Sequence, residues 1–418
     1  MKLHLASLAM GASLLLALAG GAAAADNCGD NTGQPATGEP IVIGAITGQT
    51  GPDDFSSATK AANAYFACVN ANGGIHGRPI EYKIEDDQWN PELAAQLGAK
   101  LVNDEKAVVM AASSSFVECG ANAGLYAATG ITSVAGVGVP RECFFAKAIV
   151  ATNAGPRVST VAAMQYAIDA LGAKSFTCIA PNLPGVGDWS CDGATQLSNK
   201  LGLKVDVIIM DPGSADFTSI ALQAVSNNPD AIVLALPKGL TVPLLQAAEE
   251  QGLNLTKPFL SAASAYDLSV PEAIGPGWNG QFYANMEFND AQSTAADNKN
   301  WLAVLDEFGN ASDPRDTFSQ GGYLAARIVT QALLSLPADG VTREAVTKAL
   351  GEIRDFKSDI FCTPWYYDAT SEHHNPNAAT RMAVVKDGKW EVISDCVKSD
   401  DPELADIREF ESVTGIGK

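Results

Sequence analysis

Two pairs of adjacent residues have types that could do chemistry. Asp86-Asp87 could act as paired carboxylates in acid–base catalysis, and His373-His374 could contribute metal ligands. The two aspartates, however, come just before Asn90-Pro91, a typical helix start with Asn as the cap and Pro at the first helical position. The two histidines stand beside Asn375-Pro376, a dipeptide typical of turns. We therefore predict a structural turn at the aspartates and a surface loop at the histidines.

A glycine pattern could also indicate nucleotide chemistry. Residues 275–280 match Gly-x-Gly-x-x-Gly, but they precede a predicted strand, whereas pyrophosphate binding requires a helix N-terminus at that point. The chain has no Gly-x-x-x-x-Gly-Lys loop, no His-Glu-x-x-His and no Gly-x-Ser-x-Gly. We therefore predict a turn at 275–280 and a protein that is not an enzyme, with no cofactor and no metal. A secreted hydrolase is the alternative from another functional class.

The composition excludes some partners. The 418 residues carry a net charge of -21, which repels phosphate backbones and anionic lipids, so we expect neither nucleic acid nor a membrane surface as partner. Apolar residues make up 47% of the chain, enough for sizeable cores. The length predicts two or three domains at ~150 residues each.

The first residues have the pattern of a secretory signal peptide. Lys2 precedes an apolar run over 5–18, and Ala22 to Ala25 offer small residues for cleavage. The run is shorter than the ~20 residues needed to span a bilayer, which argues against a membrane anchor. We predict a signal peptide at 1–25, an irregular leader at 26–39 and an exported chain without membrane insertion.

Strand and helix patterns alternate along the rest of the chain, which predicts parallel α/β sheets. The apolar run 41–48 and the helix that stops at Gly73-Gly74 form the first unit. Open α/β sheets bind ligands at the carboxyl ends of their strands. A helix is expected from Asn90-Pro91 to Val102, and further strands at 80–84, 107–112, 131–135, 175–180, 205–210, 231–236, 259–261 and 281–286.

Eight cysteines in an exported chain predict disulfides. The spacing does not settle the pairing, but the expected topology narrows it. Cys119 and Cys143 bracket a helix–strand unit, Cys178 and Cys191 bracket a strand-to-helix loop, and Cys362 and Cys396 lie on candidate neighbouring strands, which leaves Cys28 and Cys68. No Cys-x-x-Cys occurs, so redox catalysis and zinc ribbons are not expected.

Several motifs in a fixed order carry a family resemblance. They are Gly73-Gly74-Ile75-His76-Gly77-Arg78-Pro79, Asp86-Asp87-Gln88-Trp89-Asn90-Pro91, Ala99-Lys100-Leu101-Val102, Ser113-Ser114-Ser115, Asp216-Phe217-Thr218 and Pro229-Asp230-Ala231-Ile232-Val233. From about residue 41 to 390 the chain resembles type I periplasmic solute-binding proteins, the branched-chain amino-acid family in particular. The resemblance implies two doubly wound parallel-sheet lobes joined by three crossovers, near 152–153, 284–285 and 362–363. Lobe 1 would comprise 40–153 plus 285–362, and lobe 2 154–284 plus 363–418.

The resemblance also implies a ligand site in the cleft between the lobes. Ser113, Ser114 and Ser115 match the serine cluster that binds a ligand carboxylate through hydroxyl and N–H groups. The segment Gly136-Val137-Gly138 matches the backbone that completes this site. Without the resemblance, both segments would pass for ordinary polar or glycine turns.

The chain departs from amino-acid binders where they bind the α-ammonium. Those proteins carry an acid in the loop after the strand 259–261, and this chain has Ala263 there. Pro237 and Gly187 also stand where the family often has tyrosines. Aromatic residues and one cation are the candidates to line the pocket, alongside the alternative that they are core or hinge packing: Phe55, Phe116, Trp189, Tyr266 and Lys238. This set predicts a pocket for an apolar or aromatic organic acid.

The combined prediction is a periplasmic solute-binding subunit that delivers a small organic ligand to the permease subunits of an ABC importer by hinge closure. We expect a monomer. A sensory binding protein of the same fold, which reports ligand occupancy to a membrane receptor, is the alternative within the same class.

Overall fold

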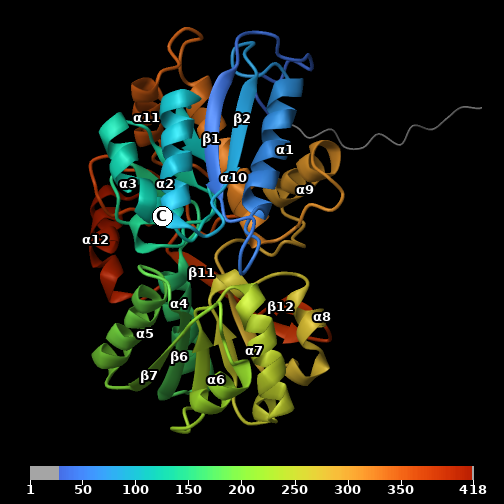
Figure 1. Ribbon diagram of the computed structural model, residues 1–418, viewed down its shortest axis with the longest axis vertical. Helices are drawn as coiled ribbons and strands as arrows, with labels where there is room; N and C mark the ends of the chain where they lie inside the picture. The colour runs from blue at the N-terminus through green and yellow to red at the C-terminus, as the bar shows by residue number, and fades with distance from the viewer. Residues whose placement is uncertain (1–27, 417–418) are drawn as a thin grey trace, which may run out of the picture.

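The computed structural model describes residues 28–416, and its strands form two sheets that lie one above the other along the long axis of the molecule (Figure 1). The predicted signal peptide lies outside the described residues. Residues 28–39, the described part of the predicted leader, contain no helix or strand. Within 28–416, no helix has the length and apolar character required to cross a membrane.

The upper sheet belongs to the first lobe and is entirely parallel. Its order is β2-β1-β3-β4-β5, and its strands are β1 Ile41–Thr47, β2 Ile80–Asp86, β3 Val109–Ala111, β4 Ser133–Ala135 and β5 Ile149–Ala151. One face packs against α1 (Ser57–Ala71), α9 (Ala296–Phe308), α10 (Thr317–Leu334) and α11 (Arg343–Gly351), and the other against α2 (Pro91–Ala99) and α3 (Glu118–Thr129). Because both faces are covered, β1 is buried nearly throughout.

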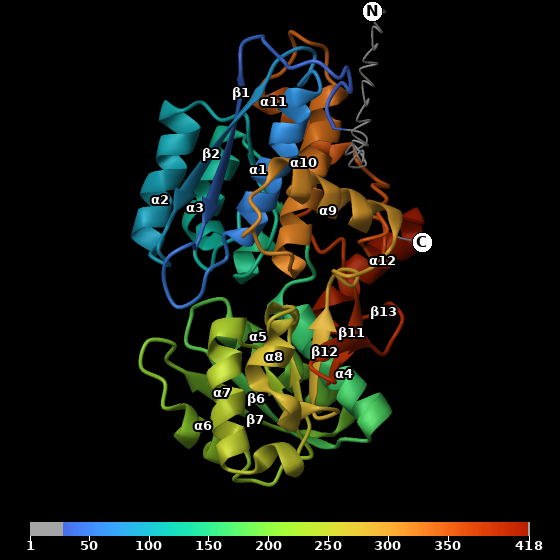
Figure 2. The same ribbon diagram turned by 90° about the vertical axis from the view of Figure 1, so that its right-hand side faces the viewer.

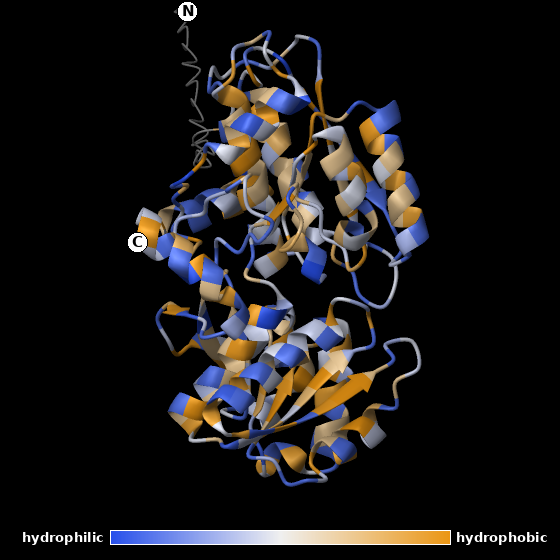
Figure 3. Ribbon diagram, turned by 90° about the vertical axis from the view of Figure 1, so that its left-hand side faces the viewer, coloured by the Kyte–Doolittle hydropathy of each residue, from blue (hydrophilic) through white to orange (hydrophobic). Residues whose placement is uncertain are grey.

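The lower sheet belongs to the second lobe and is mixed. Its order is β12-β11-β10-β9-β8-β6-β7, with β13 paired to β11, and its strands are β6 Ser175–Pro181, β7 Lys204–Met210, β8 Ala231–Leu234, β9 Phe259–Ser261, β10 Phe282–Met286, β11 Ala379–Lys386, β12 Lys389–Val392 and β13 Val397–Lys398. The pairs made by β11 are antiparallel. Helices α4 (Pro156–Leu171) and α5 (Gly187–Leu201) pack on one face, and α6 (Phe217–Ala224), α7 (Lys238–Glu250) and α8 (Val270–Ile274) on the other. The buried strands of this lobe are strongly hydrophobic (Figure 3).

Two predicted local structures are confirmed. The side chain of Asn90 caps α2, since its Oδ1 accepts a hydrogen bond from the N–H of Leu93 at 2.8 Å. A π-helical turn, Lys100–Asp104, continues this helix past its predicted end. The glycine pattern 275–280 lies between α8 and β10 and is not followed by a helix. Asp86 has a structural role, because its Oδ1 accepts the N–H of Gln49 at 2.9 Å.

The chain passes between the lobes from β5 to α4, from β10 to α9 and from α11 to β11. The C-terminal helix α12 (Ala405–Thr414) lies at mid-height, beside these connections (Figure 2). The segment just before α12 is held by the buried guanidinium of Arg157 on α4, whose Nε lies 2.8 Å from Oδ2 of Asp401. The exact lobe boundaries stay a prediction.

All eight cysteines are paired, as Cys28–Cys68, Cys119–Cys143, Cys178–Cys191 and Cys362–Cys396. These are the predicted pairs. The prediction that Cys362 and Cys396 lie on strands is wrong, since both lie outside the strands of the lower sheet. Pro364 follows Cys362 closely and has no N–H for a ladder.

The prediction that the two histidines lie in a surface loop is wrong about their exposure to solvent. His373 and His374 do lie in a loop, but both are buried because α12 covers it. The His373 ring stacks on Phe145 with centroids 4.0 Å apart, and its Nδ1 lies 2.8 Å from Oδ2 of Asp406. Burial lowers the pKa of His374 to about 4. Among residues 28–416, no cluster of three or more His, Cys, Asp or Glu side chains could hold a metal ion.

Candidate functional site

A cavity lies between the two lobes, with about 20 Å³ of free space. It is at the carboxyl ends of β1 and β3 on the first lobe and of β8 and β9 on the second, which is where parallel sheets bind ligands. Its lining comprises Phe55, Phe116, Val137, Gly138, Val139, Asn153 and Phe318, with Pro156, Ser159, Val186, Ala235, Pro237, Ser264 and Glu287. This free space holds little more than a water molecule, so a ligand can bind only when the lobes or their loops move apart.

Three phenylalanines form one wall of this cavity. Phe55 and Phe116 come from the loops after β1 and β3, and Phe318 is the second residue of α10. The rings of Phe55 and Phe116 stack with centroids 4.7 Å apart, and Phe318 meets Phe55 edge-on at 4.8 Å. Behind them Trp89 stacks on Phe116 at 4.0 Å. Because the rings support one another, the wall is rigid and suits an apolar or aromatic ligand.

A single carboxyl group, Glu287, faces this cavity and is buried. Its Oε1 accepts the N–H of Gly155 at 2.6 Å, and its Oε2 accepts from Nδ2 of Asn153 at 3.3 Å. Burial raises the pKa of Glu287 to about 7, and these hydrogen bonds only partly offset that effect. The group therefore changes charge near neutral pH, so it can accept a hydrogen bond from a ligand or, when protonated, donate one.

An acidic chamber adjoins the cavity and shares Phe55, Ser264 and Phe318 with it. Lys238 lines it, with Nζ 2.7 Å from Oδ2 of Asp267, so this cation is already paired. Tyr266 also lines it, and its hydroxyl donates to Oδ1 of Asp290 at 3.0 Å. The chamber is closed at one side by a contact between lobes, in which Oδ2 of Asp53 accepts the N–H of Gly239 at 2.8 Å.

The three predicted serines lie behind the cavity and do not line it. The Oγ of Ser113 accepts the N–H of Ile46 at 3.2 Å. Ser115 lies three residues before the start of α3, where its Oγ accepts the N–H of Glu118 at 3.0 Å and donates to Asp87. Two of the three hydroxyls are therefore used inside the lobe.

Ser114 differs from its two neighbours. Its Oγ is buried and has no hydrogen-bond partner within the described chain, and its backbone forms β-bridges with Thr47 and with Val137, a residue of the cavity wall. The side-chain oxygens of Thr47 and Ser56 are likewise buried without a partner among residues 28–416. Thr47 ends β1 and Ser56 precedes α1, so these unpaired hydroxyls lie at the two ends of the loop between the first strand and the first helix.

The remaining predicted residues divide between the cavity and the packing around it. Val137 and Gly138 line the cavity, and the N–H of Gly138 donates to Oδ1 of Asn153 at 2.7 Å. Gly136 is needed for close packing, because a Cβ there would lie 3.1 Å from Cα of Gly322 on α10. Trp189 lies apart, packed on Phe144 with Nε1 donating to Glu403 at 2.6 Å.

Comparison with known families then identifies the chain. A profile of periplasmic binding proteins matches residues 40–389. The chain belongs to this family. Comparison with curated proteins gives no significant sequence match.

Solved structures similar to this periplasmic binding protein agree in fold. A fatty acid ABC transporter substrate-binding protein from Thermomonospora curvata is 20% identical, with a TM-score of 0.76, covering 90% of this chain and 97% of its own. A solute-binding protein of an ABC transporter from R. palustris, in complex with 4-hydroxybenzoate, is 20% identical with a TM-score of 0.76 and coverage of 88% and 100%. A branched-chain amino acid transporter substrate binding protein from Streptococcus pneumoniae, in complex with isoleucine, is 17% identical with a TM-score of 0.72 and coverage of 86% and 100%.

Within this binding-protein fold, Ala263 is buried beside Ser264 and does not line the cavity, so the loop after β9 presents no carboxylate at that position. The acid of the cavity comes from Glu287 at the second crossover, which the sequence reasoning missed. A signal was available, since Glu287 is a lone charge between Met286 and Phe288 just after a predicted strand. Phe318 was missed as well, and nothing in its local sequence sets it apart from a core residue.

Proposed function

We propose that this periplasmic binding protein captures a small organic ligand with an apolar or aromatic body in the interlobe cavity and delivers it to the permease of an ABC importer. The observation that carries the proposal is the wall of Phe55, Phe116 and Phe318, which faces a cavity with few polar groups. A flat apolar surface of this kind selects for a matching ligand body.

The unpaired hydroxyls next to the wall support a carboxylate head group on the ligand. Ser114 and Thr47 have buried oxygens without partners, and the 15-residue helix α1 begins at Ser57, with its free N–H groups. Hydroxyls and a helix N-terminus favour an anion. Both oxygens lie behind the cavity wall, so the loop that carries Ser115 and Phe116 has to move before a carboxylate reaches them.

An amino-acid ligand is less well served. Ala263 offers no charge to an α-ammonium, and Glu287 already accepts two hydrogen bonds and has a pKa of about 7. An unpaired ammonium in a closed cavity costs several kcal/mol. The names of two similar structures, which state a fatty acid and 4-hydroxybenzoate, also favour a carboxylate with an apolar body.

The mechanism would be hinge closure about the three crossovers. Lobe 1 (40–153 plus 285–362) binds the ligand first, and lobe 2 (154–284 plus 363–418) closes over it, which creates the surface that the permease recognises. The protein would act as a monomer in the periplasm after removal of residues 1–25. The chemistry is binding alone, without catalysis.

Titration calorimetry tests the proposal. Benzoate, 4-hydroxybenzoate and octanoate are titrated into the purified protein next to leucine, isoleucine and valine. We expect micromolar binding of at least one of the three carboxylates and binding at least tenfold weaker for the amino acids. Micromolar leucine or valine binding with all three carboxylates silent would contradict the ligand class and leave the family assignment intact.

A further inference from the structure

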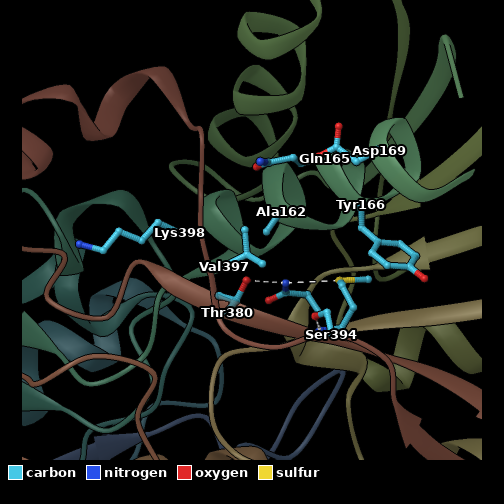
Figure 4. A pocket seen from close by; sticks show the side chains of 10 residues that line it. Ala162, Gln165, Tyr166, Asp169, Thr380, Ser394, Val397 and Lys398 are labelled. Carbon is cyan, nitrogen blue, oxygen red and sulfur yellow. Dashed lines mark hydrogen bonds between the residues drawn. The ribbon is translucent and has the colours of Figure 1, made fainter. Parts of the chain in front are cut away.

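A second cavity, of about 170 Å³, lies in the lower lobe beside the crossovers (Figure 4). It shares no lining residue with the interlobe cavity. Helix α4 contributes one side, the ends of β10 and β11 contribute another, and the segment that leads from β12 through Ser394 to β13 closes it. Each of the first three elements adjoins a crossover, so the cavity is built from the parts of lobe 2 that connect to lobe 1.

The lining of this second cavity combines an apolar surface with one unsatisfied polar group. Ala162, Tyr166, Met382 and Val397 supply the apolar surface. Asn285 is 1% exposed, and its Nδ2 donates to Oγ1 of Thr380 at 2.8 Å, whereas its Oδ1 is buried with no hydrogen-bond partner among residues 28–416. A buried amide oxygen without a partner is unfavourable, and a ligand that donates a hydrogen bond to it would offset that cost.

The charges around this cavity favour a donor over an anion. Asp169 stands exposed on α4 at the rim, and no ion pair involves it within the described chain. Lys398, the cation of the lining, points away from the other labelled side chains in Figure 4, because its Nζ lies 2.7 Å from Oε2 of Glu411. The cavity therefore presents an unpaired carboxylate and an unpaired amide oxygen, while its cation is neutralised.

We propose that the cavity bounded by α4, β10, β11 and the segment 394–398 is a second ligand site, which takes a small aromatic amine. The ring lies between Tyr166 and Met382, the nitrogen donates to Oδ1 of Asn285, and Asp169 attracts the positive charge. The hydroxyl of Ser394, whose Oγ already accepts the N–H of Met382 at 2.8 Å, has its hydrogen free for a further polar group on the ligand.

Benzylamine is the probe, and benzoate is the matched anion of similar size. Protein-observed NMR titrations of the full mature chain should show saturable benzylamine binding with a dissociation constant of ~1 mM, as expected for so small a ligand. Benzoate should bind at the same resonances, those of Tyr166 and its neighbours, with an affinity at least tenfold lower. Absence of saturable benzylamine binding overturns the site, and equal binding of benzoate at these resonances overturns the ligand class.

Substitutions locate the binding. Ala162→Phe fills the cavity and should weaken benzylamine binding at least tenfold, and Asn285→Leu should do the same by removing the amide oxygen. Ala170→Phe is the control, since Ala170 is an exposed residue of the same helix and does not line the cavity. Because Asn285 is buried, the fold of each variant is checked by its NMR spectrum, and Ala162→Phe carries the test if Asn285→Leu does not fold.

A variant of the interlobe cavity separates the two sites. Phe318→Ala should leave benzylamine binding unchanged. Loss of benzylamine binding in Phe318→Ala, with full binding in Ala162→Phe, would place the amine between the lobes and overturn this inference, whatever the result for carboxylates.

Discussion

The two faces of the interlobe cavity are built differently. The first lobe contributes three phenylalanine rings held by mutual stacking, whereas the second contributes small or aliphatic residues: Ser159, Val186, Ala235, Pro237 and Ser264. Aromatic side chains bury the largest apolar areas and dominate binding energies. We therefore expect the first lobe to supply most of the affinity and the second lobe mainly to close the cavity.

Polar contacts across the cleft are few in the described chain near the cavity: Asp53 with the N–H of Gly239, the N–H of Arg141 with the carbonyl of Gly185 at 2.8 Å, and Arg141 with Glu403 at 3.3 Å. Partly exposed pairs of this kind contribute about 0–1 kcal/mol each. Apolar contacts also cross the cleft, because Val186 packs in one cluster with the phenylalanine wall and Trp189 packs on Phe144. Closure therefore rests on apolar packing as well as on these polar pairs.

The largest expected effect concerns the acid that lies between the two faces. Burial raises the pKa of Glu287 to about 7 from 4.5, so the folded protein retains a proton that the unfolded chain has lost. Its contribution to stability is fully present below pH 4.5 and is lost as the pH rises through 7. In wild type this group should lower the free energy of unfolding by up to ~3 kcal/mol between pH 5 and pH 8, and Glu287→Gln should remove that part of the decline.

Urea unfolding of both proteins at pH 5 and pH 8 measures this difference. Asp87, Glu118 and Asp316 also have pKa values raised by burial, to about 6, 7 and 6, so the variant retains part of the decline with pH. An equal decline in wild type and variant would show that Glu287 is already ionised in the native state, and that the two lobes meet around a charge.

The second effect compares the two faces directly. Phe318→Ala removes one ring of the first-lobe wall and should weaken binding of the tightest carboxylate about 100-fold, since central aromatic residues typically contribute 2–4 kcal/mol. Val186→Ala trims the opposite face and should cost less than about fivefold. Titration calorimetry on both variants decides the matter, and a greater loss in Val186→Ala would reverse the roles assigned to the lobes.

The sequence predicted the architecture better than the site, for a physical reason. Strands, helix starts and disulfides depend on local patterns such as Asn90-Pro91, and the family motifs gave the two lobes. Phe55, Phe116, Val137 and Gly138 were found in the same way, because they follow predicted strands. Phe318 and Glu287 reach the cavity only through the crossovers, and no local pattern shows which distant segment closes a cleft. The antiparallel strands β11 and β12 depend on the same long-range return of the chain.

The third effect tests whether the missing acid decides between ligand classes. Ala263→Asp places a carboxylate in the loop after β9, where amino-acid binders carry one, and should raise leucine affinity about tenfold while lowering that for benzoate through repulsion. Ala263 is buried, so the thermal stability of the variant is measured first. Calorimetry with both ligands then gives the ratio of affinities, and a ratio unchanged from wild type in a folded variant would show that Glu287 already sets the choice.

The smallest effect concerns closure itself. Oδ2 of Asp53, on the first lobe, accepts the N–H of Gly239 at the start of α7 on the second, and burial raises the pKa of this carboxyl. Its desolvation offsets part of what the hydrogen bond and the helix dipole contribute, so the net effect should be ~1 kcal/mol.

Asp53→Ala should therefore weaken binding of the tightest ligand about fivefold and shift the unliganded protein toward open forms, with a larger radius of gyration by small-angle scattering. Asp54→Ala is the control, because Asp54 bonds within its own lobe, to the N–H of Ser56 at 2.8 Å. If Asp53→Ala changes neither the affinity nor the radius of gyration, the hydrogen bond from Gly239 to Asp53 does not hold the two faces together.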